Sequence, residues 1–353
     1  MTEAPGSVDT RLPEQETVAE FDSSHKSTFY RLLGFLQATP SAIPLFVLIT
    51  AIIVFGILNG HRFFSPFALT LILQQVAIVG IVAVAQSLVI LTAGIDLSVG
   101  AIAVMSSVIM GKFTFDLGIP PELAVLCGLA TGLFFGTANG LLVAYVKLPP
   151  FIVTLGMWQI VLAANFLYSG SVVIRSEEIA QRAPILQFFG RTIEVGGAVF
   201  TYGVILLLLL VLLMSYILSQ TAWGRHVYAV GDDPDAAELS GVKVKATLVS
   251  VYAIGGLICA FAGWALIGRL GSVSPQAGQL ANIESVTAVV IGGISLFGGR
   301  GSVAGTLFGA LIVGVFTLGL RLLGADVQWT YLLIGALIIF AVTIDQTIRK
   351  VSL

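Results

Sequence analysis

An aspartate stands in one of the most apolar stretches of this 353-residue chain, within the run LTAGIDLSVGA at 91–101. Asp96 is flanked by Gly94 and Gly100, and Ser98 follows two residues later. A carboxylate here could cap a helix by accepting hydrogen bonds from the free amides of residues 98 or 99, which contributes about 1 kcal/mol. An ionisable group within a membrane segment could instead bind a proton or an ion.

The sequence favours the capping role. An ion-coupled transporter normally carries more than one acid in its membrane segments, and no second clear acid lies in a predicted span. Gly94 would end one helix and Asp96 would start the next. We therefore predict that Gly94, Asp96, Ser98 and Gly100 form a structural hinge near the cytoplasmic face, with an ion site at Asp96 as the alternative.

A second group of residues could line a path for an uncharged, hydroxyl-rich solute. Its members are amide side chains and one tryptophan within predicted spans, which offer hydrogen-bond donors, acceptors and an aromatic face. They are Gln74, Gln75, Gln86, Asn139, Trp158, Gln159 and Asn165. Each of them could instead form a hydrogen bond between helices.

Several other kinds of chemistry have no support in the sequence. The phosphate-binding pattern G-x-x-x-x-G-K-[ST] is absent, so the chain is not expected to hydrolyse ATP itself. The three histidines are scattered and suggest neither a metal site nor a catalytic triad. We predict no enzyme activity, no cofactor and no metal, and the net charge of −2 gives no sign of nucleic-acid binding. Cys127 and Cys259 fall in predicted spans and are expected to be packing residues.

Composition sets the class of protein. Apolar residues make up 57% of the chain, charged residues make up 10%, and the mean hydropathy is +1.01, whereas an ordinary soluble domain is about 25% charged. We predict an all-α polytopic membrane protein with ten spans of about 20 mostly apolar residues each. The predicted spans are 43–60, 67–92, 97–115, 122–145, 151–169, 201–219, 247–268, 284–297, 303–322 and 328–345.

The polar segments complete the predicted organisation. Residues 1–40 are interpreted as a disordered acidic tail, because a secretory signal would have a basic start and an apolar core. Residues 41–353 form the predicted membrane domain, with long connections at 170–200 and 220–246. The distribution of Lys and Arg favours both termini in the cytoplasm, the first connection outside and the second inside.

Each long connection carries a predicted element. Residues 170–200 mix apolar and charged side chains, which is compatible with a short amphipathic element on the membrane surface. In the second connection, the Asp-Pro pair at 233–234 is a helix-start signal, and Gly241 is placed to stop the short helix over 235–240. So short a helix has no stability alone, so it is expected to dock onto a partner.

Glycines recur four residues apart in two of the predicted spans, which allows a neighbouring backbone to approach closely. They are Gly128, Gly132, Gly136 and Gly140 in the fourth span, and Gly301, Gly305 and Gly309 in the ninth. We favour tight packing within one subunit over a moving or oligomeric interface. The matching positions are also compatible with two inverted five-helix halves, which the sequence leaves open.

Four stretches carry a resemblance to a known family. They are LTAGIDLSVGA at 91–101, VAYVKLPPFIVTLGM at 143–157, AVGDDPDAAELSGVKV at 229–244 and AVVIGGISLFGGRGSVAGTLFGALI at 288–312. In this order they resemble the permease subunits of bacterial monosaccharide importers of the ATP-binding-cassette class, from about residue 40 to the C-terminus. The ribose, xylose and fructose permeases are the most similar types, and FDSSHKS in the tail with ILQQ in the second span favours the fructose type.

The resemblance implies a function and a set of partners. Two permease copies, expected to form a homodimer, would lie in the lipid of the bacterial inner membrane. The dimer would bind cytoplasmic ATPase subunits and receive a monosaccharide from a periplasmic sugar-binding protein. The connection at 170–200 would face the binding protein. Coupling to the ATPase would fall to Asp235, Ala236, Ala237, Glu238, Leu239, Ser240 and Gly241.

Transport would then proceed by alternating access driven by ATP. An ion-coupled secondary transporter that uses Asp96 is the alternative, and a channel-like facilitator is a third hypothesis. Only the importer requires the docking helix at 235–240.

Overall fold

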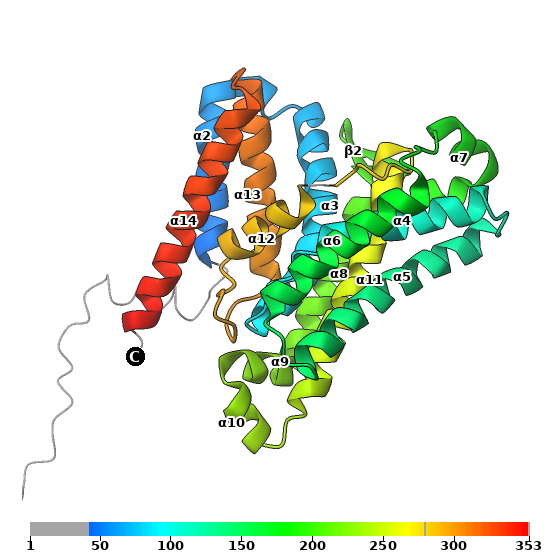
Figure 1. The fold of residues 1–353 in the computed structure, drawn as a ribbon. Helices are drawn as coiled ribbons and strands as arrows, with labels where there is room; N and C mark the ends of the chain where they lie inside the picture. Colours follow the sequence, from blue (N-terminus) through cyan, green and yellow to red (C-terminus); the bar gives the residue numbers. More distant parts are fainter. Residues whose placement is uncertain (1–41, 279, 352–353) are drawn as a thin grey trace, which may run out of the picture. The chain divides into compact units, whose positions relative to one another are not determined.

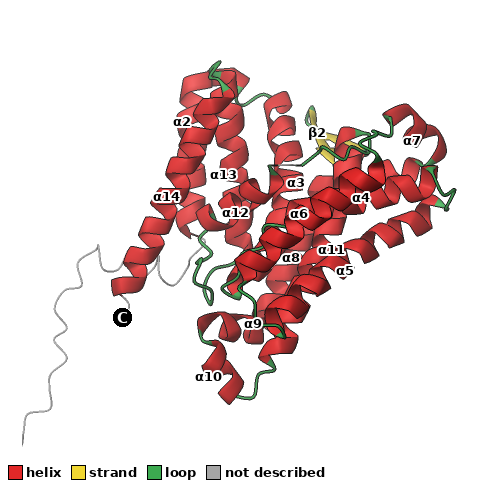
Figure 2. Cartoon of the chain, viewed as in Figure 1, coloured by secondary structure: helices red, strands yellow, loops and turns green. Residues whose placement is uncertain are grey.

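The computed structural model describes residues 42–278 and 280–351, and it is almost entirely helical (Figures 1 and 2). The predicted tail at 1–40 lies outside the described residues. The all-α prediction is confirmed, and each of the ten predicted spans corresponds to a helix. These helices are α2 (Ala42–Asn59), α3 (Pro66–Leu91), α4 (Val99–Phe115), α5 (Pro121–Ala144), α6 (Pro150–Ser169), α8 (Tyr202–Gln220), α11 (Val244–Leu270), α12 (Ala281–Ile291), α13 (Val303–Leu322) and α14 (Val327–Val351).

The helices differ in whether they can cross a membrane alone. Seven are long and apolar enough: α2, α3, α5, α6, α8, α11 and α13. The apolar parts of α4, α12 and α14 are shorter. The predicted eighth span at 284–297 was wrong at its end, because α12 stops at Ile291 and Gly293 turns the chain with a φ of 82°.

The connection at 170–200 contains more structure than the sequence suggested. It holds α7 (Ser176–Arg182), a 3₁₀ helix η2 (Pro184–Gly190) and an antiparallel hairpin of β1 (Thr192–Val195) and β2 (Ala198–Thr201). Gly196 and Gly197 form its two-residue turn with φ of 60° and 82°, as a type I′ turn requires. The other short elements are η1 (Gly60–Arg62), α9 (Ala222–Asp232) and α10 (Pro234–Leu239).

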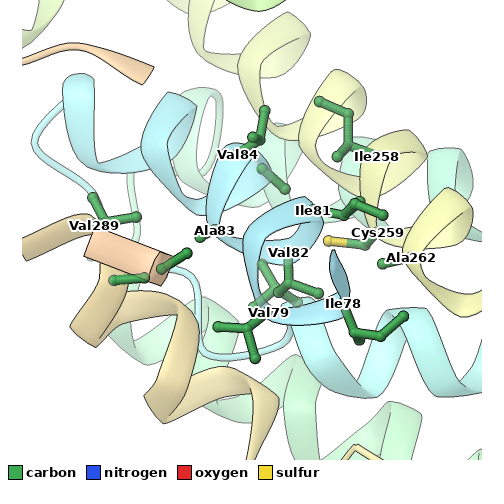
Figure 3. Packing of buried hydrophobic residues seen from close by; sticks show 14 of the residues in the cluster. Ile78, Val79, Ile81, Val82, Ala83, Val84, Ile258, Cys259, Ala262 and Val289 are labelled. Carbon is green, nitrogen blue, oxygen red and sulfur yellow. The ribbon is translucent and has the colours of Figure 1, made fainter. Parts of the chain in front are cut away.

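Helix α3 forms the centre of the core. Every residue from Val76 to Leu91 is buried, which is typical of a helix that is apolar on all sides. Its neighbours are α8, α11, α12 and α13. Figure 3 shows Ile78, Val79 and Ile81–Val84 packed near Ile258, Cys259 and Ala262 of α11 and Val289 of α12. Cys259 is therefore a core packing residue, as predicted.

The glycine ladders pack within the chain, as the sequence favoured. A Cβ atom on Gly136 of α5 would lie 2.9 Å from the Cα atom of Gly256 in α11, and one on Gly140 would lie 2.8 Å from the Cα atom of Val249. On α13, Gly305 and Gly309 press against the backbone of α12 in the same way. Larger side chains would force these helix pairs apart.

Candidate functional site

The junction between α3 and α4 begins with a left-handed residue. Ala93 has a φ of 58°, and the amides of Ala93 and Gly94 donate to the carbonyls of Ile90 (2.9 Å) and Val89 (3.0 Å). The expectation that Gly94 itself breaks the helix was therefore wrong in detail. Glycine is needed at position 94 because there is no room for a side chain: a Cβ atom there would lie 2.9 Å from the Tyr252 hydroxyl.

Asp96 is buried at this junction and is surrounded by neutral donors. Its Oδ1 atom accepts from the amide of Ser98 (2.7 Å) and from the Ser98 hydroxyl (2.6 Å). The Asn139 amide of α5 donates in turn to the same hydroxyl (2.9 Å). The carboxylate thus holds the residue at the N-cap position of α4 in place.

A residue from a distant part of the chain caps a free backbone amide in the first turn of α4. The amide of Gly100 donates to Oδ1 of Asn282 on α12 at 2.6 Å. The sequence analysis missed Asn282, because nothing in the pattern links two residues 182 positions apart. A side-chain amide therefore satisfies a free helix amide that Asp96 does not reach.

Two further side chains hold the backbone of the junction, one from α3 itself and one from the neighbouring helix α6. In the orientation that satisfies both groups, the Gln86 amide donates to the Asp96 carbonyl (2.9 Å) and accepts from the Asp96 amide (3.2 Å). The Thr154 hydroxyl of α6 donates to the Ile95 carbonyl (3.0 Å). The junction is therefore fixed by α3, α5, α6 and α12 together.

The junction between α12 and α13 repeats the backbone turn with other side chains. Gly293 is left-handed, and the amides of Gly293 and Ile294 donate to the carbonyls of Val290 (3.0 Å) and Val289 (3.2 Å). Glycines at 298, 299 and 301 continue the turn with positive φ. Ser302 then caps α13 by accepting from the Gly305 amide (3.1 Å).

Helix α9 lies against both junctions. The amide of Gly299 donates to the Leu91 carbonyl at 3.0 Å, and Gly231 of α9 packs against both residues with no room for a Cβ atom. The Tyr228 hydroxyl donates to the Gly301 carbonyl at 2.9 Å, and burial raises the pKa of this hydroxyl. A displacement of α9 would therefore move the backbone at both junctions.

Helix α10 follows α9 directly and shows the predicted short helix with its stop. Asp233 accepts from the amides of Asp235 (2.9 Å) and Ala236 (3.0 Å), and Gly241 ends the element with a φ of 87°. Ala237 is buried, whereas Leu239 is 91% exposed. In Figure 1, α9 and α10 lie together at the end of the spans opposite to α7 and β2.

The residues predicted to line a path do not converge on one site. Gln86 and Asn139 belong to the α3–α4 junction. Gln75 accepts from Arg269 at 2.8 Å, and Asn165 donates to the Pro275 carbonyl at 2.8 Å. Gln74 and Trp158 are half-buried, and Gln159 is exposed on α6.

The sequence analysis missed two charged residues, the hydrogen-bond partner of Gln75 and an acid that interacts with that partner. Arg269 lies in the last turn of α11, and Glu284 in the first turn of α12 interacts with it electrostatically. The statement that no predicted span holds a second clear acid was wrong, because Glu284 opens the span predicted at 284–297. In the described part of the chain, no group of three side chains could hold a metal ion.

Comparison with known proteins assigns the chain to a family. Residues 68–342 match the family described as branched-chain amino acid transport system / permease component. The chain is 67% identical over 335 residues to the fructose import permease protein FrcC of Rhizobium meliloti, which covers 95% of this chain and 93% of the relative.

More distant relatives carry similar names. The chain is 37% identical to the ribose import permease protein RbsC of Bacillus subtilis over 89% of this chain and 94% of the relative. It is 32% identical to the xylose transport system permease protein XylH of Escherichia coli K12 over 90% of this chain and 96% of the relative. No solved structure matches the chain. The polytopic helical fold and these matches together show that the chain belongs to the family of transport-system permease components.

Proposed function

We propose that this chain is the membrane permease subunit of an ATP-driven importer that receives a monosaccharide, with fructose favoured, from a periplasmic binding protein. The observation that carries the proposal is the 67% identity, over nearly the whole chain, to a fructose import permease. The ribose and xylose permeases are less similar. Transport would proceed by alternating access across the inner membrane, with both termini in the cytoplasm.

The exposed tip of α10 supports an ATPase partner. A leucine that is 91% exposed on a capped six-residue helix has no packing role within its own chain. Such a helix gains stability when its apolar side chain enters a groove on another protein. We assign the coupling surface to Asp235–Gly241, with Leu239 as its apolar anchor.

The link from α10 to the spans supports a route for coupling. Helix α10 continues from α9, and α9 contacts Leu91 at one junction and Gly299 and Gly301 at the other. A push on α10 by the ATPase would therefore reach the start of α4 and the start of α13 through packed backbone. The opposite end of the spans, with α7 and the hairpin, would receive the binding protein. A second copy of the chain would complete the path.

The ion-coupled alternative is not favoured. The relatives are import permeases, and the contacts of Asp96 are those of a structural group, namely Ser98 and the Gln86 amide on its backbone. We propose that Gly94, Asp96, Ser98 and Gly100 form the hinge at which α3 and α4 meet.

The experiment is uptake of labelled fructose, ribose and xylose into proteoliposomes that hold this chain with its ATPase and binding protein. We expect uptake that requires both partners and ATP and that is fastest for fructose. Uptake by the chain alone that a protonophore abolishes would overturn the proposal.

A surface variant tests the coupling role. We expect Leu239→Ser to lower ATP-driven uptake more than tenfold and to leave the melting temperature of the detergent-purified chain unchanged. The matched control is Leu117→Ser, since Leu117 is also an exposed leucine, at 60%, in the connection between α4 and α5. An equal loss in both variants would argue against a specific docking surface.

A further inference from the structure

Outside the two junctions, a hydrogen bond joins polar side chains of α11 and α3, and an acid on α12 interacts electrostatically with the same arginine. The guanidinium of Arg269 on α11 donates to Oε1 of Gln75 on α3 at 2.8 Å. Glu284 on α12 is the acidic partner of Arg269. We call these residues the Gln75–Arg269–Glu284 cluster.

The cluster lies where the chain cannot form a full span. Helix α12 has 11 residues, which extend about 16 Å, whereas the hydrocarbon layer is about 30 Å thick. The described residues before it, 271–278, are irregular backbone and supply part of the remaining depth. Such backbone occurs at that depth only when it is buried in protein or lines a water-filled cavity, and in transporters it is typical of binding sites.

The connection is held on its outer side by specific hydrogen bonds. The Gln187 amide donates to the Gly271 carbonyl at 2.7 Å, and the Asn165 amide donates to the Pro275 carbonyl at 2.8 Å. These bonds fix the first part of the connection, at Gly271 and Pro275.

The cluster retains capacity to bind a ligand. Arg269 is exposed, and Gln75 and Glu284 are half-buried. A guanidinium has five N–H donors, of which Gln75 takes one, and a carboxylate offers about four acceptor positions. A charged group that faced acyl chains would cost about 3 kcal/mol, so we infer that this face meets water.

We propose that Gln75, Arg269 and Glu284 form a binding site for the monosaccharide within the permease, an inference that rests on the proposed function. Neighbouring hydroxyl groups of a sugar donate to the carboxylate of Glu284 and accept from the guanidinium of Arg269. Gln75 orients Arg269 and offers its own amide. The opposite charges cancel, which suits a neutral ligand.

A purely structural ion pair is the competing explanation, because a cation in the last turn of a helix also interacts favourably with the helix dipole. The test therefore needs a readout that only ligand contact would move. We choose the penalty for a missing sugar hydroxyl, defined as the ratio of uptake rates of fructose and of a deoxyfructose analogue. Every permease variant is assayed with the same binding protein, saturated with sugar. The binding protein's own preference for fructose over the analogue is therefore the same in every variant and cancels when penalties are compared.

The variants are Glu284→Gln, Arg269→Lys and Gln75→Leu in the complete ATPase and binding-protein complex. For at least one analogue, we expect the penalty measured with Glu284→Gln to be about fivefold or more below the penalty measured with the wild type. One of the other two variants should lower the penalty for the same analogue. The matched controls are Glu122→Gln and Arg321→Lys, an acid in the first turn of α5 and a base in the last turn of α13. Their penalties should equal those of the wild type.

Each outcome decides a separate question. Penalties that stay at the wild-type value in all three variants, while total uptake falls, would overturn the sugar site and leave a structural ion pair. If Glu284→Gln does not reach the membrane, Arg269→Lys and Gln75→Leu carry the same comparison. If the wild-type complex shows no ATP-dependent sugar uptake, the proposed function fails first, and the site fails with it.

Discussion

The junction between α3 and α4 and the junction between α12 and α13 end their first helix with the same pair of backbone hydrogen bonds. They differ in what holds the chain afterwards. The first junction uses side chains, with Asp96, Ser98, Asn139 and Gln86 in one hydrogen-bonded group. The second uses glycines, which let its backbone lie directly against α9.

The difference shows two ways to interrupt a helix inside a membrane protein. Backbone groups freed by a break need partners, because lipid offers none. Polar side chains supply them at the first junction at the cost of burying a carboxylate. Close backbone approach supplies them at the second, where the Gly299 amide donates to the Leu91 carbonyl of the first. The two junctions are therefore one connected unit.

The largest expected effect comes from a change that affects both junctions together. A Cβ atom on Gly231 would overlap the Leu91 carbonyl and lie 2.7 Å from the Gly299 amide nitrogen. We expect Gly231→Ala to lower the free energy of unfolding by about 3 kcal/mol and to abolish uptake. Thermal unfolding in detergent measures the first effect. Gly156→Ala, at a position with open space, is the control, and a normal melting curve for Gly231→Ala would show that the junctions are not connected.

A change confined to the side-chain junction should have a smaller effect. Asp96→Ala removes the acceptor of two buried donors on Ser98, so we expect a loss of about 2 kcal/mol. Asp96→Asn keeps an acceptor and should fold and transport nearly as the wild type does. The measurement pairs thermal unfolding with sugar uptake. Normal folding without uptake in Asp96→Asn would show that the charge itself is needed and would restore the ion-site alternative.

The left-handed residues give a reciprocal test. Ala93 and Gly293 occupy equivalent positions with φ of 58° and 82°, and Ala93 is exposed. A side chain in this conformation costs about 1 kcal/mol. We expect Ala93→Gly to stabilise the protein and Gly293→Ala to destabilise it, each by about that amount. Changes of the same sign in chemical denaturation would contradict the equivalence of the two turns.

An effect of the same size is expected at the contact between α9 and the junction between α12 and α13. Tyr228→Phe removes one hydrogen bond to the Gly301 carbonyl, which contributes about 1 kcal/mol. Burial raises the pKa of the Tyr228 hydroxyl, so its contribution is complete below the unfolded-state pKa of about 10 and declines only above it. The difference in melting temperature between the two proteins should therefore be constant from pH 6 to about pH 9. A difference that shrinks within this range would show that the hydroxyl loses its proton earlier.

Much of the fold could be predicted from the sequence. All ten spans correspond to helices, because about 20 apolar residues between polar breaks carry a strong signal. A short helix over 235–240 was expected from the Asp-Pro pair at 233–234 and from Gly241, and α10 spans 234–239, since caps are local features. The inverted halves stay a prediction. The two similar junctions join spans two to three and eight to nine, which are not counterparts in such halves.

The site could be predicted only in part. Asp96 was found because an acid in an apolar run is conspicuous, whereas Asn282 was not, because its contact with Gly100 depends on the folded arrangement of α4 and α12. Polar residues that looked alike in the sequence have different partners in the structure, such as Arg269 for Gln75 and a backbone carbonyl for Asn165. Long-range pairing of this kind leaves no periodic pattern in the sequence.

The shortness of α12 has a consequence for how the protein is made. Insertion machinery that tests one segment at a time favours about 20 apolar residues, and a charge within a helix adds a cost of up to about 3 kcal/mol. An 11-residue helix that carries Glu284 fails both conditions. Its apolar face is covered by α3 and α13, so we expect α12 to enter the membrane only once α13 has been synthesised. We therefore expect α12 and α13, residues 281–322, to enter the membrane together, and a chain that ends before α13 to leave Glu284 outside the hydrocarbon layer.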